Sequence, residues 1–354
     1  MAALALEVND AGLLALREGQ PRPEPESPSV ALFEDGEVLT GRAAAARALL
    51  RPRAVHDAYF DSLDAEPLRR PFPAGVRRAD LGYAHLVTLI ESLPQRPDEA
   101  FLAVPGFWTA ERLGLLLGVA RAAGLPVAGL VDAAVVAASL VGGRGSLLHL
   151  DLTRHRCVVT ALSGGREVAR TAVADTEGLG QRAFDERVTH EIARLFVLQT
   201  RFDPLHSGAS EQALHDALPA WLFELRREER CTEVLTAGGR EHRIDIARAD
   251  LATVLADLHR GLAAQVRALL DTSVTRLLVS ARVSRFPGAV DRLREATGLD
   301  VLELTPDAVV SATLRNRDRL RHPGPALPFV TRLPTRDEAA SPSAPGSDPR
   351  VREL

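Results

Sequence analysis

The sequence predicts an α/β protein made of two lobes, residues 1–145 and 146–320, that each begin with a β-hairpin. A turn-like segment, Glu7–Gly12, separates two short apolar runs near the N-terminus, and the strand, turn and strand pattern returns over 147–162. Between these hairpins, residues 100–140 alternate strand and helix patterns, as α/β folds do. With 354 residues, of which 46% are hydrophobic, the chain can bury a core in each lobe.

The first lobe is expected to open on two hairpins. Ala2–Leu6 and Leu13–Leu16 are the predicted strands of the first, and Val30–Phe33 and Val38–Gly41 are those of the second. A helix over Arg42–Leu50 is expected to follow, so strands give way to helices along this lobe.

The remainder of the first lobe reads as strand, helix, strand, helix. Ala100–Val104 is a short buried strand, and Thr109 is a good N-cap for a helix over Ala110–Ala123, where apolar residues recur at helical spacing. Val127–Val131 is the next strand and Ala133–Leu140 the next helix.

The second lobe repeats the opening of the first, with strands at Leu147–Leu152 and Cys157–Leu162. Further elements are expected in this order: helices over 181–200 and 211–230, a hairpin around Gly238 and Gly239, a helix over 249–270, a strand over 276–279 and a helix over 288–297.

Two segments are expected to lie outside the folded lobes. Gly142–Gly145 precedes its strand instead of following one, so it is a linker and not a dinucleotide-binding turn. Residues 333–354 are rich in Pro, Ser, Ala and charge and contain few large apolar side chains. They are predicted to form a disordered tail.

Composition excludes several classes of function. A net charge of −4 and a pI near 6.2 provide no basic field for nucleic acid. Cys157 and Cys231 are far apart and form no CxxC pair, which favours a reducing, cytoplasmic setting. The apolar run Leu113–Leu140 is interrupted by Arg121 and Pro126, so no membrane span is expected. Glu7 and Asp10 interrupt the apolar N-terminus, so no signal peptide is expected either.

The absence of lysine is more restrictive still, because all 43 basic residues are arginine. A P-loop needs a lysine to reach the terminal phosphates of its nucleotide, and Schiff-base enzymes and protein kinases also depend on lysine. These mechanisms are therefore excluded.

Several segments, in order, are similar to motifs of a known family. Leu102–Phe107 resembles its Val-Pro-Ala-Tyr-Phe strand, Asp132–Ala138 its Asn-Glu-Pro-Thr-Ala-Ala helix, and Pro306–Val309 its closing Pro-Asp-Glu-Ala-Val. Ala120–Leu125 and Phe184–Arg187 also agree. Over roughly residues 1–315 the chain resembles the nucleotide-binding domain of the seventy-kilodalton heat-shock chaperones, without their peptide-binding domain. The resemblance implies the two-lobed, actin-like ATPase fold, a duplicated ribonuclease-H-like fold.

The phosphate-handling turns are where the chain departs from the family. The family's Asp-Leu-Gly-Thr-Thr turn is matched by Glu7–Ala11, and its glycine-rich Asp-Leu-Gly-Gly-Gly-Thr turn by Asp151–Arg156, which contains no glycine. Glycine serves in such turns because a side chain would collide with the approaching phosphate. Turnover of ATP is therefore expected to be weak or absent.

The resemblance nevertheless implies a set of site residues. Glu7, Asp132 and Asp151 fall at the family's catalytic acids, and Glu7 and Asp151 are the candidate ligands of Mg²⁺, held through water. The residues that would contact ATP or ADP are Asn9, Asp10, Thr153, Arg154, Arg156, Gly180, Ser280 and Arg285.

Each of these residues also has an explanation without ligand. The acids fall at strand ends and helix starts, where carboxylates act as caps. Arg154 and Arg156 either contact phosphate or pair with the remaining carboxylates and lock the lobes together. His149, Asp151 and His155 could suggest a metal cluster, but a strand places only the first two on one face and no fourth ligand is evident.

Two functions follow from these observations. The first is a heat-shock-chaperone-like protein that binds ATP or ADP between its lobes with weak or no hydrolysis. The alternative is a pseudo-ATPase scaffold or regulator that acts through a protein partner without nucleotide. A sugar kinase of the same superfamily would need an aspartate base over the sugar hydroxyl, and no such residue is identifiable.

Overall fold

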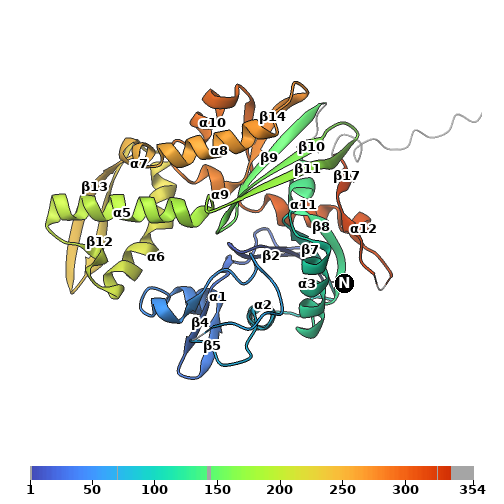
Figure 1. Ribbon diagram of the computed structural model, residues 1–354, viewed down its shortest axis with the longest axis horizontal. Coiled ribbons are helices and arrows are strands. Elements are labelled where there is room, and N and C mark those ends of the chain that lie inside the picture. The colour runs from blue at the N-terminus through green and yellow to red at the C-terminus, as the bar shows by residue number, and fades with distance from the viewer. Residues whose placement is uncertain (1, 70, 142–144, 325, 336–354) are drawn as a thin grey trace, which may run out of the picture.

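The computed structural model describes residues 2–69, 71–141, 145–324 and 326–335. Helices and strands are interspersed throughout this part of the chain, which confirms the predicted α/β class. Most strands belong to two separate six-stranded mixed sheets (Figure 1). Most of the predicted linker, 142–144, and most of the predicted tail, 336–354, lie outside the described residues.

The first sheet has the strand order β16-β8-β7-β1-β2-β3. The predicted N-terminal hairpin is its antiparallel part, β1 with β2 and then β3, while β7, β8 and β16 add parallel to β1. Its strands are β1 Ala3–Val8, β2 Gly12–Arg17, β3 Ser27–Pro28, β7 Glu99–Val104, β8 Val127–Asp132 and β16 Phe329–Val330.

The second sheet has the order β15-β14-β9-β10-β11-β17. Its hairpin strands β9, β10 and β11 are antiparallel, and β14 and β15 add parallel to β9. Its strands are β9 Ser146–Leu152, β10 Arg156–Ser163, β11 Glu167–Glu177, β14 Val274–Val279, β15 Asp300–Glu303 and β17 Arg332–Pro334. The long strand β11 is absent from the sequence prediction.

Two smaller sheets lie at the periphery. Both predicted hairpins, one near residue 35 and one around Gly238 and Gly239, are confirmed here. The strands are β4 Ala31–Glu34, β5 Glu37–Thr40 and β6 Val55–His56 in one sheet and β12 Arg230–Ala237 and β13 Arg240–Ala247 in the other.

The helices that the sequence predicts begin close to their expected starts, whereas those over Arg78–Ser92 and Ala308–Arg315 are absent from the sequence prediction. The Thr109 hydroxyl caps α3 by accepting a hydrogen bond from the Arg112 amide. The α-helices are α1 Gly41–Ala45, α2 Arg78–Ser92, α3 Ala110–Ala122, α4 Ala133–Ala138, α5 Gln181–Thr200, α6 Gly208–Leu225, α7 Arg248–Val254, α8 Ala256–Ala268, α9 Ala281–Ser284, α10 Ala289–Thr297, α11 Ala308–Arg315 and α12 Arg317–Leu320. Short 3-10 helices span Pro52–Ala54 and Pro204–His206.

Three helix predictions need correction. The helix expected over 42–50 ends at Ala45, and the one expected over 211–230 ends at Leu225, so that β12 can begin at Arg230. The helix expected over 249–270 divides into α7 and α8 at Leu255, which is completely buried. Apolar periodicity continues through that break because both short helices pack on one core.

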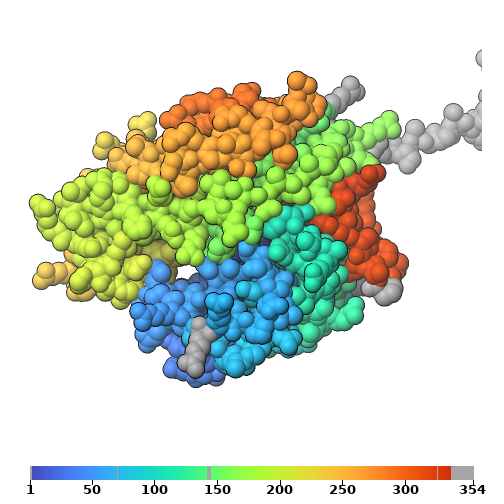
Figure 2. All heavy atoms as spheres, viewed as in Figure 1, coloured from blue at the N-terminus to red at the C-terminus, as the bar shows by residue number. Residues whose placement is uncertain are grey.

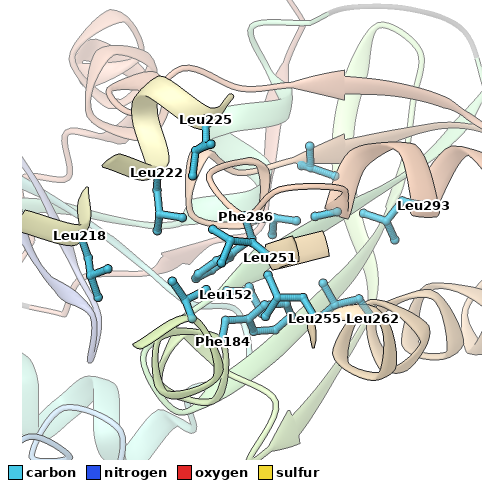
Figure 3. Close-up of a cluster of buried hydrophobic side chains, with 14 of the residues drawn as sticks. Leu152, Phe184, Leu218, Leu222, Leu225, Leu251, Leu255, Leu262, Phe286 and Leu293 are labelled. Atoms are coloured by element: carbon cyan, nitrogen blue, oxygen red, sulfur yellow. The ribbon is translucent and has the colours of Figure 1, made fainter. Parts of the chain in front are cut away.

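Each large sheet has its own apolar core, and a third core lies between the sheets. In the second half, leucines of α6 and α7 converge with Phe184 and Phe286 around Leu152 of β9 (Figure 3). Between the sheets, α11 contacts β1, β7 and α4, and α4 contacts β11. The apolar run Leu113–Leu140 divides into α3, β8 and α4, and no helix in the described ranges is long and apolar enough to cross a membrane.

The end of the described chain is bound to both sheets. After α12, Phe329–Val330 pairs with β8 of the first sheet and Arg332–Pro334 pairs with β11 of the second. Leu333 is buried, and the Thr335 amide donates to the Arg166 carbonyl oxygen. The predicted start of the disordered tail at residue 333 is therefore wrong, because residues 333–335 belong to the fold.

Candidate functional site

The turns of the two equivalent hairpins meet face to face between the sheets. The carboxylate of Asp10, in the turn after β1, accepts hydrogen bonds from the backbone N–H groups of Arg154 (3.2 Å) and His155 (3.0 Å), in the turn after β9. It also bonds Nδ1 of His155 at 2.8 Å. Asp10 therefore occupies the amide groups of the second turn, which a bound anion would otherwise use.

His155 is held between two carboxylates of the first half. Its Nε2 lies 3.5 Å from Oδ1 of Asp57, opposite its bond to Asp10. Burial opposes protonation of the imidazole, but the hydrogen bonds to Asp10 and Asp57 outweigh burial and raise the pKa of His155 to about 9. The ring is therefore a cation at neutral pH.

Arg154 and Arg156 tie the second turn to the first half. Arg154 Nε donates to Asp57 at 2.7 Å, and Arg156 Nε donates to Asp61 at 2.6 Å. Arg156 also pairs with Asp175 of its own sheet. The prediction that these arginines pair with the candidate catalytic acids is wrong, because their partners are Asp57, Asp61 and Asp175.

Asp57 and Asp61 follow the short strand β6, and no motif in the sequence marked them as site residues. We call Asp10, Asp57, Arg154 and His155 the charged cluster.

Asn9 and Thr153, both predicted to contact nucleotide, stabilise their own turns. Oδ1 of Asn9 accepts from the Ala11 amide at 2.8 Å, and its Nδ2 donates to Glu7 at 3.0 Å. The Thr153 hydroxyl accepts from the Arg156 amide at 3.2 Å. These contacts give each turn an Asx or Ser/Thr cap.

Gly180 permits α5 to begin directly on the second turn. A Cβ at Gly180 would lie 2.4 Å from the Arg154 carbonyl oxygen, so a larger residue would push the helix away. The amides of Gln181 and Arg182, in the first turn of α5, donate to the carbonyl oxygens of Thr153 and Arg154, both at 2.9 Å. The donors at this helix start thus already have backbone partners.

Two of the predicted acids share a guanidinium that the sequence analysis did not assign. Arg282, at the start of α9, donates from Nε and Nη2 to the two carboxylate oxygens of Asp151 at 3.0 and 2.9 Å. Its Nη2 also bonds Glu7 of the opposite sheet. We call Glu7, Asp151 and Arg282 the guanidinium triad.

The pKa values of the two acids in the triad shift in opposite directions. Burial alone would raise the pKa of Asp151, but the charge of Arg282 outweighs burial and lowers that pKa to about 2. At Glu7, which is 2% exposed, burial outweighs Arg282 and raises the pKa. One arginine therefore stands between both carboxylates that were the candidate Mg²⁺ ligands.

The third predicted acid, Asp132, lies with a different arginine. It is fully buried at the end of β8, caps α4 by accepting from the Ala134 amide, and pairs with Arg170 of β11 at 2.8 Å. Arg170 Nη1 also donates to the Gly106 carbonyl oxygen at 2.7 Å. A Cβ at Gly106 would lie 2.4 Å from Oδ2 of Asp132, so this pairing requires glycine there.

Ser280 and Arg285 flank α9 on the second sheet. The Ser280 amide donates to the Leu150 carbonyl oxygen at 3.0 Å, which fixes the start of α9 beside β9. Arg285 lies over the Phe286 ring and pairs with Asp185. Ser280 and Arg285 line the same cavity as the triad, and the charge of Arg285 is compensated by Asp185.

The two halves are also joined by hydrogen bonds between α6 and the segment after α1. The side-chain amide of Gln212, on α6, donates to the Ala45 carbonyl oxygen at 3.1 Å and accepts from the Leu49 amide at 3.0 Å. The blue segment that contains residues 45–49 and the yellow-green segments of the second half face each other here across an opening (Figure 2). A cavity of about 320 Å³ lies between them.

A larger cavity, about 900 Å³, lies on the other side of the triad. Its walls include Leu14 of β2, Leu222 and Phe223 of α6, and Leu304 after β15, and the triad forms part of its boundary. We call it the apolar cavity. Within the described ranges, no group of three or more His, Cys, Asp or Glu side chains is placed to hold a metal ion. Neither His149 nor His155 belongs to such a group.

Comparison with known proteins adds no assignment. A scan against protein-family models and a search of curated proteins each found no match to this chain.

Proposed function

We propose that this chain is a pseudo-ATPase scaffold with a heat-shock-chaperone-like, actin-like fold, acting through a protein partner without turning over ATP. The observation that carries the proposal is the Asp10 carboxylate, which holds the amide groups of Arg154 and His155. In an actin-like ATPase these amides would face phosphate. An internal carboxylate there competes with any phosphate for the same donors.

The strand order supports the duplicated fold. The hairpin and its parallel neighbours run β3-β2-β1-β7-β8 in one sheet and β11-β10-β9-β14-β15 in the other, with the same directions in both. In each sheet the central strand ends in an acid, Glu7 near the end of β1 and Asp151 near the end of β9. A duplicated unit would place these two acids opposite one another.

The guanidinium of Arg282 also lies between the two carboxylates that would hold Mg²⁺. Arg282 bridges Glu7 and Asp151, and its single charge satisfies oxygens that Mg²⁺-bound waters would need. These residues therefore do not fit a magnesium nucleotide. Because phosphoryl transfer depends on positioned donors and a cation, we expect little or no hydrolysis.

The scaffold would be held in one closed arrangement. The charged cluster, the guanidinium triad and the Gln212 contacts all join the two halves without any ligand. A partner would then recognise a fixed surface, and the exposed Val197 and Leu198 of α5 are candidate contact residues.

One observation favours a second candidate, binding of ATP or ADP without hydrolysis. The apolar cavity is large enough for a nucleoside, and Ser280 and Arg285, which the resemblance assigns to nucleotide, line it. The phosphates would then have to displace Asp10 or leave the cavity toward solvent.

Thermal unfolding with ligand separates the two candidates. A ligand that binds only the folded state stabilises it by RT ln(1 + [L]/Kd), about 4 kcal/mol at a thousandfold excess over Kd. The scaffold proposal expects no change in midpoint with millimolar ATP or ADP plus Mg²⁺. A rise of several degrees that depends on nucleotide concentration would support nucleotide binding instead.

A further inference from the structure

We propose that the apolar cavity binds a small, uncharged aromatic molecule that carries one hydrogen-bonding group, with Phe223 as its wall and His149 as its polar contact. The proposal rests on the proposed function in one respect, since it takes the phosphate-binding turns to be closed. It goes beyond that function by assigning a ligand class to a site that scaffolding does not require.

The shape and lining of the cavity favour an aromatic ligand. Phe223 is 52% exposed and, with Leu14 and Leu304, faces the cavity. The Arg227 guanidinium lies 4.6 Å from the centre of the Phe223 ring, and the rest of the ring is available as an aromatic wall of the kind that lines small-molecule sites. A volume of about 900 Å³ accommodates a molecule of two or three rings.

His149 provides the polar contact. It lies on β9 two residues before Asp151, so both side chains point to the same face of the sheet and line the cavity. It is 3% exposed, and its Nε2 has no hydrogen-bond partner among the described residues. An unpaired buried polar atom is costly, and a ligand hydroxyl or N–H would remove that cost.

The charges around the cavity disfavour an anion. Five acidic and four basic side chains line it, and three of the four arginines are already paired: Arg226 with Glu303, Arg285 with Asp185 and Arg282 within the triad. A phosphate or carboxylate would therefore meet little uncompensated positive charge, and its burial would be costly. An uncharged molecule avoids this cost.

The probe for this proposal is N-phenyl-1-naphthylamine, an uncharged aromatic amine whose fluorescence rises in apolar surroundings. We expect saturable binding to the full chain and roughly tenfold weaker binding by Phe223→Ala, because the aromatic wall is lost. Tyr83→Ala is the matched control, since Tyr83 is an aromatic side chain that is 42% exposed on α2, outside the cavity lining, and the variant should bind the probe like the wild type. Equal affinity of all three proteins, or no saturable binding, would overturn the proposal while the scaffold function stands.

A second measurement isolates His149. 1-Phenoxynaphthalene has an ether oxygen in place of the N–H, so the wild type should prefer the amine by roughly fivefold. His149→Leu should reduce that preference to about onefold, and its thermal midpoint reports whether it folds. An unchanged preference would remove His149 from the site. Displacement of the probe by Mg²⁺-ADP would show instead that the cavity takes a phosphorylated ligand, and would overturn both this proposal and the scaffold function.

Discussion

The charged cluster and the apolar cavity lie on either side of the guanidinium triad, and they differ in how completely the chain satisfies its own groups. Asp10 fills the amide donors of the second turn, and Asp57 and Arg154 complete an ion-pair array around His155. In the cavity, Phe223 is 52% exposed, with the Arg227 guanidinium over its ring, and Nε2 of His149 has no partner among the described residues. The comparison shows that internal contacts fill the charged cluster, where phosphate was expected, whereas the apolar cavity remains open.

The largest expected effect is at the boundary between the two regions. Arg282→Leu would leave Glu7 and Asp151 as buried carboxylates without a counter-charge, which should lower the free energy of unfolding by about 3–5 kcal/mol. Urea denaturation at pH 7 measures this loss.

Arg292→Leu is the control, because its pair with Glu295 has both side chains more than 60% exposed. It should change the free energy of unfolding by less than about 1 kcal/mol. A similarly small loss in Arg282→Leu would mean that the triad does not hold the halves together.

A smaller loss is expected within the charged cluster. Asp10→Ala removes the acceptor of two backbone amides and of His155, which should lower the free energy of unfolding by about 1–3 kcal/mol. The variant also frees the second turn for an external anion, so sulfate or phosphate should raise its thermal midpoint more than that of the wild type.

Asp257→Ala removes an exposed pair with Arg187 and serves as the control for ionic strength. If anions stabilise Asp10→Ala no more than Asp257→Ala and the wild type, the turn is not an anion site.

The two regions should also titrate in opposite directions. The pKa of His155 is raised from an ordinary 6.5 to about 9, so its contribution to stability is complete below about pH 6.5 and is lost as pH rises through 9. The pKa of His149 is lowered to about 4, so its neutral ring favours folding above about pH 6.5, and that contribution falls as pH drops toward 4.

Denaturation curves between pH 4 and pH 10 test both histidines. His155→Gln should flatten the alkaline limb of the stability profile and His149→Leu the acidic limb. Loss of both limbs in either single variant would contradict the assignment of one histidine to each region.

The smallest effect is expected on the hollow side. Phe223→Ala removes a side chain that is already half exposed, so the free energy of unfolding should change by less than about 1 kcal/mol, in contrast to Arg282→Leu. A loss of several kcal/mol would show that Phe223 is part of the core and that the cavity closes around it.

Local patterns predicted much of the secondary structure. The turn predicted over Glu7–Gly12 is present but spans only residues 9–11, and the cap Thr109 lies where the sequence placed it, because both depend on residues close in sequence. Strand β11 was missed because its burial does not alternate strictly and much of it is exposed, so its apolar pattern is weak. The break at Leu255 was missed for the opposite reason, since apolar periodicity runs through it.

The partners of the site residues depend on contacts that no local pattern reveals. Arg282 is 275 residues from Glu7, and Arg154 is 97 residues from Asp57. The resemblance pointed to both turns and to Glu7 and Asp151, and the carboxylates of these two acids bind one guanidinium. It gave no sign that Asp10 and Arg282 would occupy the positions expected for phosphate and cation, because those contacts arise only when the two sheets face each other.

The central claim, that the chain closes its own phosphate and cation positions, is tested most directly by phosphate release from Mg²⁺-ATP by purified protein. The wild type and Asp151→Ala should release phosphate at the same background rate, because losing one of the charge-stabilising contacts of an active site costs roughly a hundredfold or more and here none is free to act. Steady turnover by the wild type that Asp151→Ala abolishes would contradict the account and establish Asp151 as a working catalytic carboxylate.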